Sequence, residues 1–197
     1  MMHLNLLLKI LNIFMNEIIP KTRQGVSLGN KIFGGAILKR DDFSLVISEC
    51  NNEIENPLWH GEIHTLNKYY ELSESIRPSP KDCIFLSSHE PCSLCLSAIT
   101  WAGFTEFYYL YSYNETASKY NIPHDLNILR EVFNINDGNY RKHNSYWKSY
   151  YIIDLINNLS DDEKNIIKPL MKKIQNSYSQ LSENYQSIKN STNIPLK

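Results

Sequence analysis

Apolar residues recur along this chain with two different periods, which indicates that strands and helices alternate. Four short apolar runs are typical of strands, and they span residues 33–38, 43–48, 83–86 and 106–113. The first two are joined by a four-residue polar segment, so we expect them to form a hairpin. Residues 59–72 carry apolar positions at helical spacing, and residues 92–102 are expected to form another helix. This alternation predicts an α/β layer fold.

The first nineteen residues are strongly apolar but are interrupted by Lys9, Asn12, Asn16 and Glu17. The segment lacks a positive start and a small-residue cleavage site, which a secretory signal would carry. It is also too polar to span a membrane. We therefore expect an amphipathic first helix packed on the sheet, with a targeting segment as the alternative.

The last third of the chain predicts further helices. Residues 146–159 have helical periodicity, and Ser160 followed by Glu163 forms a capping box for another helix. Pro169 is expected to kink that helix. From Ser177 the chain turns polar, which predicts a partly frayed helix and a loose end.

Length and charge narrow the classes of function. A chain of 197 residues can bury the core of one domain and add an appendage. Its formal net charge is −1, so it lacks the overall basic surface that binding to nucleic acid requires. Scattered Lys and Arg pairs favour a solvated surface over a local basic patch. We expect no nucleic-acid partner.

The candidate chemistry lies in two short motifs, H-G-E at 60–62 and P-C-S-L-C at 91–95. His60, Cys92 and Cys95 are a catalytic rather than a structural zinc set, since three ligands leave a fourth position for a water of lowered pKa. Glu62 is placed to act as general acid and base. A thioredoxin-like redox pair is the alternative for the two cysteines. His64 is expected in the core or behind the metal ligands.

These motifs resemble those of the cytidine deaminase superfamily, in the segments H-G-E-I at 60–63 and S-H-E-P-C-S-L-C-L-S-A-I at 88–99. The second segment and A-I-T-W-A at 98–102 are most similar to bacterial guanine deaminases and tRNA adenosine deaminases, while H-G-E-I also resembles fungal cytosine deaminase. The likeness runs from about residue 25 to residue 133. It implies a three-layer α/β/α cytidine-deaminase-like fold, with a mixed central sheet and helices on both faces. We expect a deaminase domain over residues 1–135 and a helical extension with a polar tail over 136–197.

The resemblance also suggests which residues hold a substrate. An Asn after the second strand binds the base in relatives, and either Asn51 or Asn52 could correspond to it. Aromatic side chains sandwich a flipped base, for which Trp59 and Trp101 are candidates. Asp125 matches an acidic residue that contacts the purine in guanine deaminases, although it could equally be the N-cap of a short helix. The C-terminal tail could cover the active site of its own or a neighbouring subunit, or contribute nothing.

The expected function is zinc-dependent deamination of a free nucleobase or nucleoside with release of ammonia. Guanine is the first candidate substrate and cytosine or cytidine the second. A tRNA adenosine deaminase and a non-catalytic zinc-stabilised interaction module remain alternatives. We expect a homodimer, with Phe107, Tyr108 and Tyr109 on an edge strand as the subunit contact. A zinc site with thiolates favours a reducing, cytoplasmic compartment, in which Cys50 and Cys83 would be free core residues.

Overall fold

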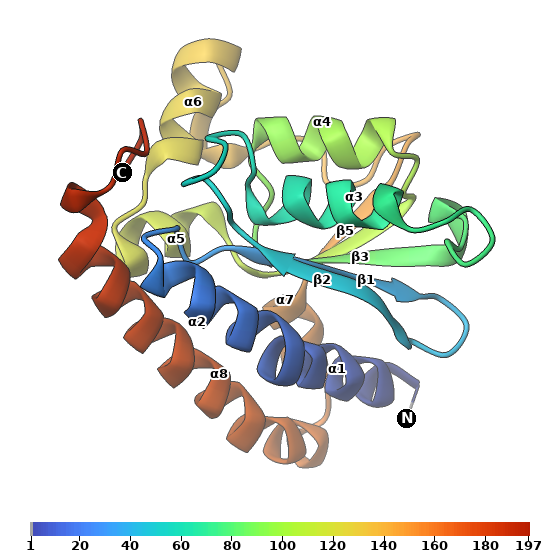
Figure 1. Ribbon diagram of the computed structural model, residues 1–197. Coiled ribbons are helices and arrows are strands. Elements are labelled where there is room, and N and C mark those ends of the chain that lie inside the picture. The colour runs from blue at the N-terminus through green and yellow to red at the C-terminus, as the bar shows by residue number, and fades with distance from the viewer. Residues whose placement is uncertain (1) are drawn as a thin grey trace.

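A computed structural model describes residues 2–197, which build one five-stranded mixed sheet (Figure 1). The strand order is β2-β1-β3-β4-β5. Strand β1 is antiparallel to both β2 and β3, whereas β3, β4 and β5 run parallel to one another. The strands span Gly34–Lys39 (β1), Leu45–Cys50 (β2), Cys83–His89 (β3), Glu106–Tyr111 (β4) and Lys148–Tyr151 (β5). The predicted hairpin and mixed sheet are confirmed.

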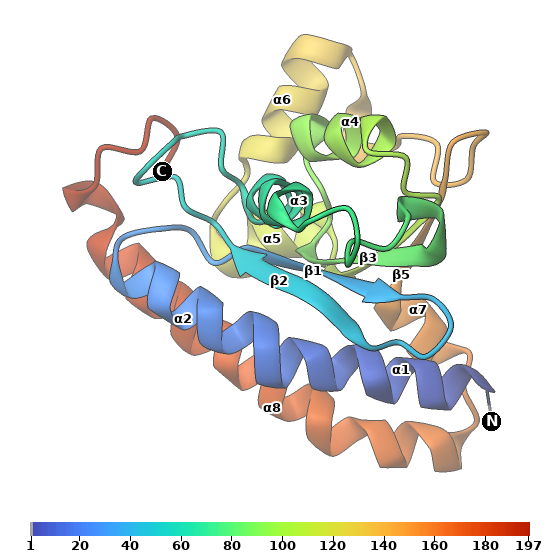
Figure 2. The same ribbon diagram turned by 45° about the vertical axis from the view of Figure 1, so that its right-hand side comes forward.

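Helices cover both faces of the sheet, as Figures 1 and 2 show. One face carries α3 (Gly61–Glu71) and α4 (Ser93–Trp101). The other carries α1 (Met2–Ile13), α2 (Ile19–Ser27) and α8 (Asp161–Ile188). Each face has its own apolar cluster, because successive side chains of a strand point to opposite sides. The three-layer α/β/α arrangement is therefore confirmed. The remaining helices are α5 (Tyr113–Tyr120), α6 (His124–Phe133) and α7 (Ile152–Asn157).

The N-terminal segment forms the expected amphipathic helix. A π-helical turn over Phe14–Ile18 joins α1 to α2, so the three pieces make one long rod. Its buried side chains include Ile10, Phe14 and Ile18, all in the cluster that lies beneath the sheet. Among the described residues, no helix combines the length and the apolar character that a membrane span requires.

The structure corrects the prediction for residues 146–159. Residues 148–151 form β5, which pairs in parallel with β4, and only the short helix α7 follows. Strand β4 is therefore internal, and Phe107, Tyr108 and Tyr109 are buried rather than exposed on an edge. The prediction that these three residues form a subunit contact is wrong, because β5 and the helices cover them.

The prediction of a frayed helix from Ser177 is also wrong. Helix α8 continues through Pro169 to Ile188, and Figure 2 shows it running beside α1 and α2. Tyr178, Leu181 and Tyr185 recur at helical spacing and are fully buried against that layer. Most polar residues of this segment are exposed on its other face, which is why its average composition resembles that of a loose end.

Candidate active site

Two helix N-termini bring the metal-ligand candidates together at one edge of the sheet. His60 is the N-cap residue of α3, which follows the loop after β2. Cys92 is the N-cap residue of α4, which follows β3, and Cys95 lies in the first turn of that helix. The free N–H groups and dipole of a helix N-terminus favour thiolate, so both cysteines stand where their ionised form is stabilised.

The three ligand atoms are close enough to share one ion. The Nδ1 atom of His60 lies 3.4 Å from the Cys92 sulfur and 3.7 Å from the Cys95 sulfur, and the two sulfurs are 3.5 Å apart. Both cysteines are free thiols. These separations suit a tetrahedral zinc ion with bonds of about 2.3 Å to sulfur and about 2.0 Å to nitrogen. His60, Cys92 and Cys95 form a candidate metal site with one nitrogen and two sulfur donors.

Glu62 lies directly against this site. Its side chain is buried, accepts a hydrogen bond of 2.8 Å from Ser87 Oγ and lies 3.3 Å from the Cys95 sulfur. Burial raises the pKa of Glu62, and the neighbouring Cys92 thiol adds to this effect. A carboxyl group with a raised pKa can both accept and return a proton near neutral pH.

Close packing of α3 on the sheet fixes the position of Glu62. A Cβ atom on Gly61 would lie 2.7 Å from Gly34 Cα and 2.8 Å from Gly34 N, both of them backbone atoms of β1. Glycine at position 61 thus lets the helix start approach the strand closely. The motif residue between His60 and Glu62 has a packing role that its spacing alone did not reveal.

Only one of the two candidate asparagines lies against the start of α3. Asn51 is buried, accepts a hydrogen bond from the backbone N–H of Gly61 and donates one of 2.7 Å to Glu53. Asn52 instead donates to Glu55 at the surface. The loop after β2 therefore directs Asn51, rather than Asn52, toward the start of α3.

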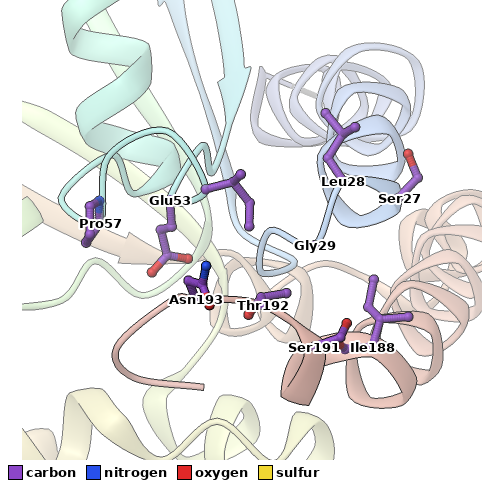
Figure 3. A pocket seen from close by; sticks show the side chains of 10 residues that line it. Ser27, Leu28, Gly29, Glu53, Pro57, Ile188, Ser191, Thr192 and Asn193 are labelled. Carbon is purple, nitrogen blue, oxygen red and sulfur yellow. The ribbon is translucent and has the colours of Figure 1, made fainter.

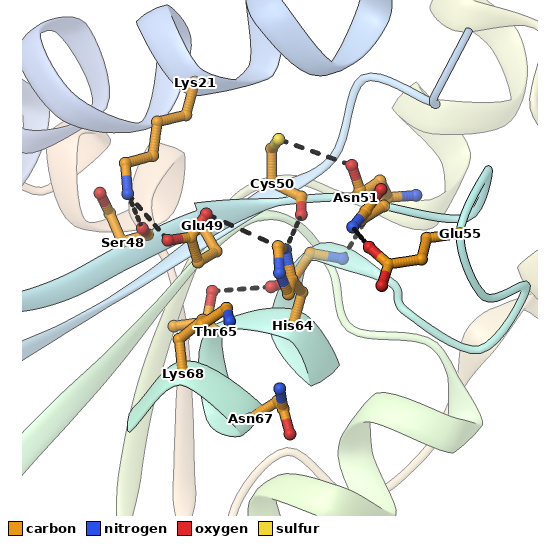
Figure 4. A network of polar contacts seen from close by, with 12 residues as sticks. Lys21, Ser48, Glu49, Cys50, Asn51, Glu55, His64, Thr65, Asn67 and Lys68 are labelled. Carbon is orange, nitrogen blue, oxygen red and sulfur yellow. Dashed lines mark hydrogen bonds and ion pairs between the residues drawn. The ribbon is translucent and has the colours of Figure 1, made fainter. Parts of the chain in front are cut away.

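The two tryptophans occupy positions that do not suit a base sandwich. Trp101 is 91% exposed at the end of α4. Trp59 stacks on His64 with ring centroids 5.5 Å apart. His64 contacts the Cys50 carbonyl oxygen at 2.9 Å through Nδ1 (Figure 4), which places it behind the site. Neither tryptophan lines the cavity described next.

A cavity of about 340 Å³ opens beside the candidate ligands. His60 and Cys92 form part of its wall, and Asp125 at the start of α6 faces them. Burial raises the pKa of Asp125 well above its usual range, with Cys92 contributing further. Much of the remaining wall is apolar and includes Phe33, Leu58, Leu94, Ile122, Ile128, Ile194, Pro195 and Leu196.

The C-terminal segment therefore reaches the site. Ile194 is 2% exposed, and His124 Nε2 lies 2.9 Å from the Lys197 backbone oxygen. Figure 1 shows this segment turning back from the end of α8 toward the loop that precedes α3. Of the outcomes considered for the tail, covering the site of its own subunit matches this arrangement.

Sequence reasoning missed several residues at the site. Lys31 and Glu53 line the cavity and form a buried ion pair of 2.7 Å. Lys142 pairs with Glu90, just before Cys92, and its ammonium lies 3.7 Å from the centroid of the Tyr140 ring. Because each pair joins segments far apart in sequence, no local motif could have revealed them.

Comparisons with known proteins agree with this geometry. The family model described as the cytidine and deoxycytidylate deaminase zinc-binding region matches residues 9–111. The chain is 27% identical over 107 residues to guanine deaminase of Bacillus subtilis (strain 168), a match that covers 53% of this chain and 66% of the relative. The chain thus spans just under two thirds of the length of that relative.

Two guanine deaminases of known structure are among the matches, and the first of them shows the same fold. A guanine deaminase from Nitrosomonas europaea matches with a TM-score of 0.50 at 15% identity, covering 88% of this chain and 82% of that one. The structure of the Bacillus subtilis guanine deaminase matches with a TM-score of 0.44 at 26% identity, covering 55% and 68% of the two chains. With more than half of its residues matched and the ligand set assembled in space, the chain belongs to the cytidine and deoxycytidylate deaminase zinc-binding family.

Proposed function

We propose that this protein is a zinc-dependent hydrolase that removes the exocyclic amine of a free nucleobase, with guanine as the first candidate. The observation that carries this proposal is the buried Glu62 carboxyl group beside the three ligand atoms of His60, Cys92 and Cys95. A purely structural metal site has no need for such a group. When bound, zinc would lower the pKa of a water molecule and so supply the nucleophile.

In this proposal the protein residues orient the base and move the protons. Glu62 takes a proton from the attacking water and delivers it to the ring nitrogen. It then takes the remaining proton of the hydroxyl group that has been added to the ring carbon and gives it to the leaving amine, so that a carbonyl forms as ammonia departs. Ser87 holds the Glu62 carboxylate in place by donating to Oε1. Asp125, on the facing wall, is the candidate contact to a ring N–H.

The cavity supports a small, uncharged substrate. Its volume is near the lower end of the range of about 300–1,000 Å³ for small-molecule sites. Lys31, the one cationic side chain among the described residues of its wall, is already paired with Glu53, so no unpaired cation is present there to bind a phosphate group. Similarity to the Bacillus subtilis guanine deaminase favours guanine among the bases that would fit the cavity, which is why guanine is the first candidate substrate.

Replacing Glu62 by Gln tests the proposal. An amide cannot carry the proton, so we expect the rate of ammonia release from guanine to fall about 10²- to 10⁴-fold in Glu62→Gln. The assay compares guanine, cytosine, adenine and their nucleosides, and the zinc content of both proteins is measured beside it. Glu55→Gln, at the surface of the loop that precedes α3, is the control and should retain full activity. Equal activity of Glu62→Gln and the parent protein would contradict the mechanism.

A further inference from the structure

The cavity wall contains an ion pair that the proposed mechanism does not use. The Lys31 ammonium contacts Glu53 Oε1 at 2.7 Å, and the side chains are only 6% and 3% exposed. Taking such a pair out of water costs free energy that its mutual attraction recovers only with good geometry, so it is weak evidence for stability. Its position in the wall of the cavity suggests a role in binding.

Glu53, which accepts from Lys31, is itself held in place from several sides. Its Oε1 atom accepts from Lys31 and lies 3.9 Å from His60 Nε2, the ring nitrogen that faces away from the thiols. Its Oε2 atom accepts a hydrogen bond of 2.7 Å from Asn51. Figure 3 shows Glu53 beneath the loop that carries Pro57, facing Asn193 of the C-terminal segment. Both Glu53 and Pro57 line a neighbouring hollow as well as the cavity.

Part of the hydrogen-bonding capacity of the Lys31 ammonium is not used by the described residues. An ammonium carries three N–H groups, and in the contacts between described residues Lys31 donates only to Glu53. Among the described residues that line the cavity, it is also the only lysine or arginine. Since Glu53 already balances its charge, the remaining N–H groups suit a neutral acceptor, such as a carbonyl oxygen or an unprotonated ring nitrogen, better than a second anion.

The position of Lys31 relative to Glu62 indicates which part of the base it would meet. The two thiols contact the Nδ1 side of the His60 ring, and Glu62 lies against the Cys95 thiol. Glu53, which pairs with Lys31, instead lies near the Nε2 side of that ring. A purine whose amine points at Glu62 extends across the cavity, so that its far edge approaches the wall with Lys31. We propose that Lys31, held by Glu53, is a specificity-determining residue that donates to the carbonyl oxygen of a 6-oxopurine. This inference rests on the proposed function and deepens it.

Binding measurements test this inference apart from catalysis. The parent for the test is the zinc-loaded Glu62→Gln protein, and the probes are guanine and 2-aminopurine, which carry the same amine at C2 but differ in the C6 oxygen. We expect the parent to prefer guanine, and we expect Lys31→Met to weaken guanine binding about 10- to 100-fold, as for the loss of a charged hydrogen bond. Binding of 2-aminopurine should change less than about threefold in the same comparison.

Two further variants keep the test decisive. Lys31→Met/Glu53→Gln removes both charges, avoids leaving a buried carboxylate unpaired, and should lose the same preference. Lys21→Met is the control, because Lys21 is also paired with a glutamate, Glu49, at 2.9 Å (Figure 4) but does not line the cavity. It should leave the preference intact. Equal weakening of both probes would show a structural role and overturn the inference, as would an unchanged preference in both Lys31 variants.

The result is distinguishable from failure of the proposed function. If the protein prefers guanine through Lys31 but releases no ammonia, the result supports the inference about Lys31 and contradicts the deaminase proposal. A protein that deaminates another base and binds neither purine would overturn the inference alone.

Discussion

At the scale of single residues, the most unusual environment belongs to His89 at the end of β3. Its ring is buried among Tyr111, Tyr120 and Tyr178, and its Nδ1 atom lies 2.9 Å from Ser88 Oγ. Its Nε2 atom has no hydrogen-bond partner among the described residues. Burial lowers the pKa of His89 to about 3, since a charged imidazole would lose its hydration there.

This burial predicts a pH-dependent stability. In the unfolded chain the pKa of a histidine is about 6.5. Between about pH 6.5 and pH 3 this side chain is therefore protonated in the unfolded state but neutral in the folded protein. The contribution of neutral His89 to the free energy of unfolding is therefore fully present above about pH 6.5. It falls as the pH drops toward 3, by up to about 1.4 kcal/mol per pH unit. Urea unfolding from pH 7.5 to 4 should show this slope, and His89→Phe should reduce it.

The control for this prediction is His143→Phe, which changes an exposed histidine. It should keep the slope of the parent protein. Identical slopes for the parent and His89→Phe would show that another group controls acid unfolding.

At the scale of elements, local patterns predicted the fold well where the signal is local. The hairpin and the first helix have clear periodicity, and the capping box at Ser160 is present with Glu163 at N3. The zinc motifs are local too, because each lies within one turn of a helix start. Strand β5 was missed because it has four residues, and its identity depends on pairing with the distant β4. Lys31 and Glu53 were missed for the same reason, since only the fold brings them together.

The prediction at the scale of elements concerns the stability that helix α8 contributes. Tyr185 lies in its last turns and is fully buried against the N-terminal helices. Tyr185→Ala should lower the free energy of unfolding by about 3–5 kcal/mol, as for other large aromatic side chains removed from a core. Tyr146→Ala, which removes a tyrosine that is 68% exposed, is the control and should cost under about 0.5 kcal/mol. If chemical denaturation gave equally small losses of unfolding free energy for the two variants, the frayed-helix interpretation would be supported instead.

At the scale of the whole molecule, the cavity is assembled from segments that span almost the full sequence. Lys31 precedes β1, Glu53 and His60 follow β2, Cys92 follows β3, and Ile194 comes after α8. The family match ends at residue 111, so the walls formed by α6 and the C-terminal segment lie outside it. Zinc chemistry is thus encoded in the matched part, while much of the shape of the cavity comes from elsewhere.

Deleting residues 192–197 tests the contribution of the tail. The variant removes Ile194, Pro195 and Leu196 from the cavity wall and so opens that side of the cavity to solvent. We therefore expect guanine to bind at least about tenfold more weakly, with zinc content unchanged. Leu28→Ala, in the neighbouring hollow, is the control and should bind normally. Unchanged affinity after the deletion would show that the tail is not part of the binding site.

The return of the C-terminal segment to the cavity has a consequence for proteolysis. A ligand enclosed there contacts residues that precede the first strand and residues that follow the last helix, and so acts as a non-covalent tether between distant parts of the chain. Because it binds only the folded form, a ligand at one hundred times its Kd would add about 2.7 kcal/mol to the free energy of unfolding. The same occupancy would shield the backbone around Ile194 from cleavage, so that resistance of the C-terminus to a protease reports whether the cavity is filled.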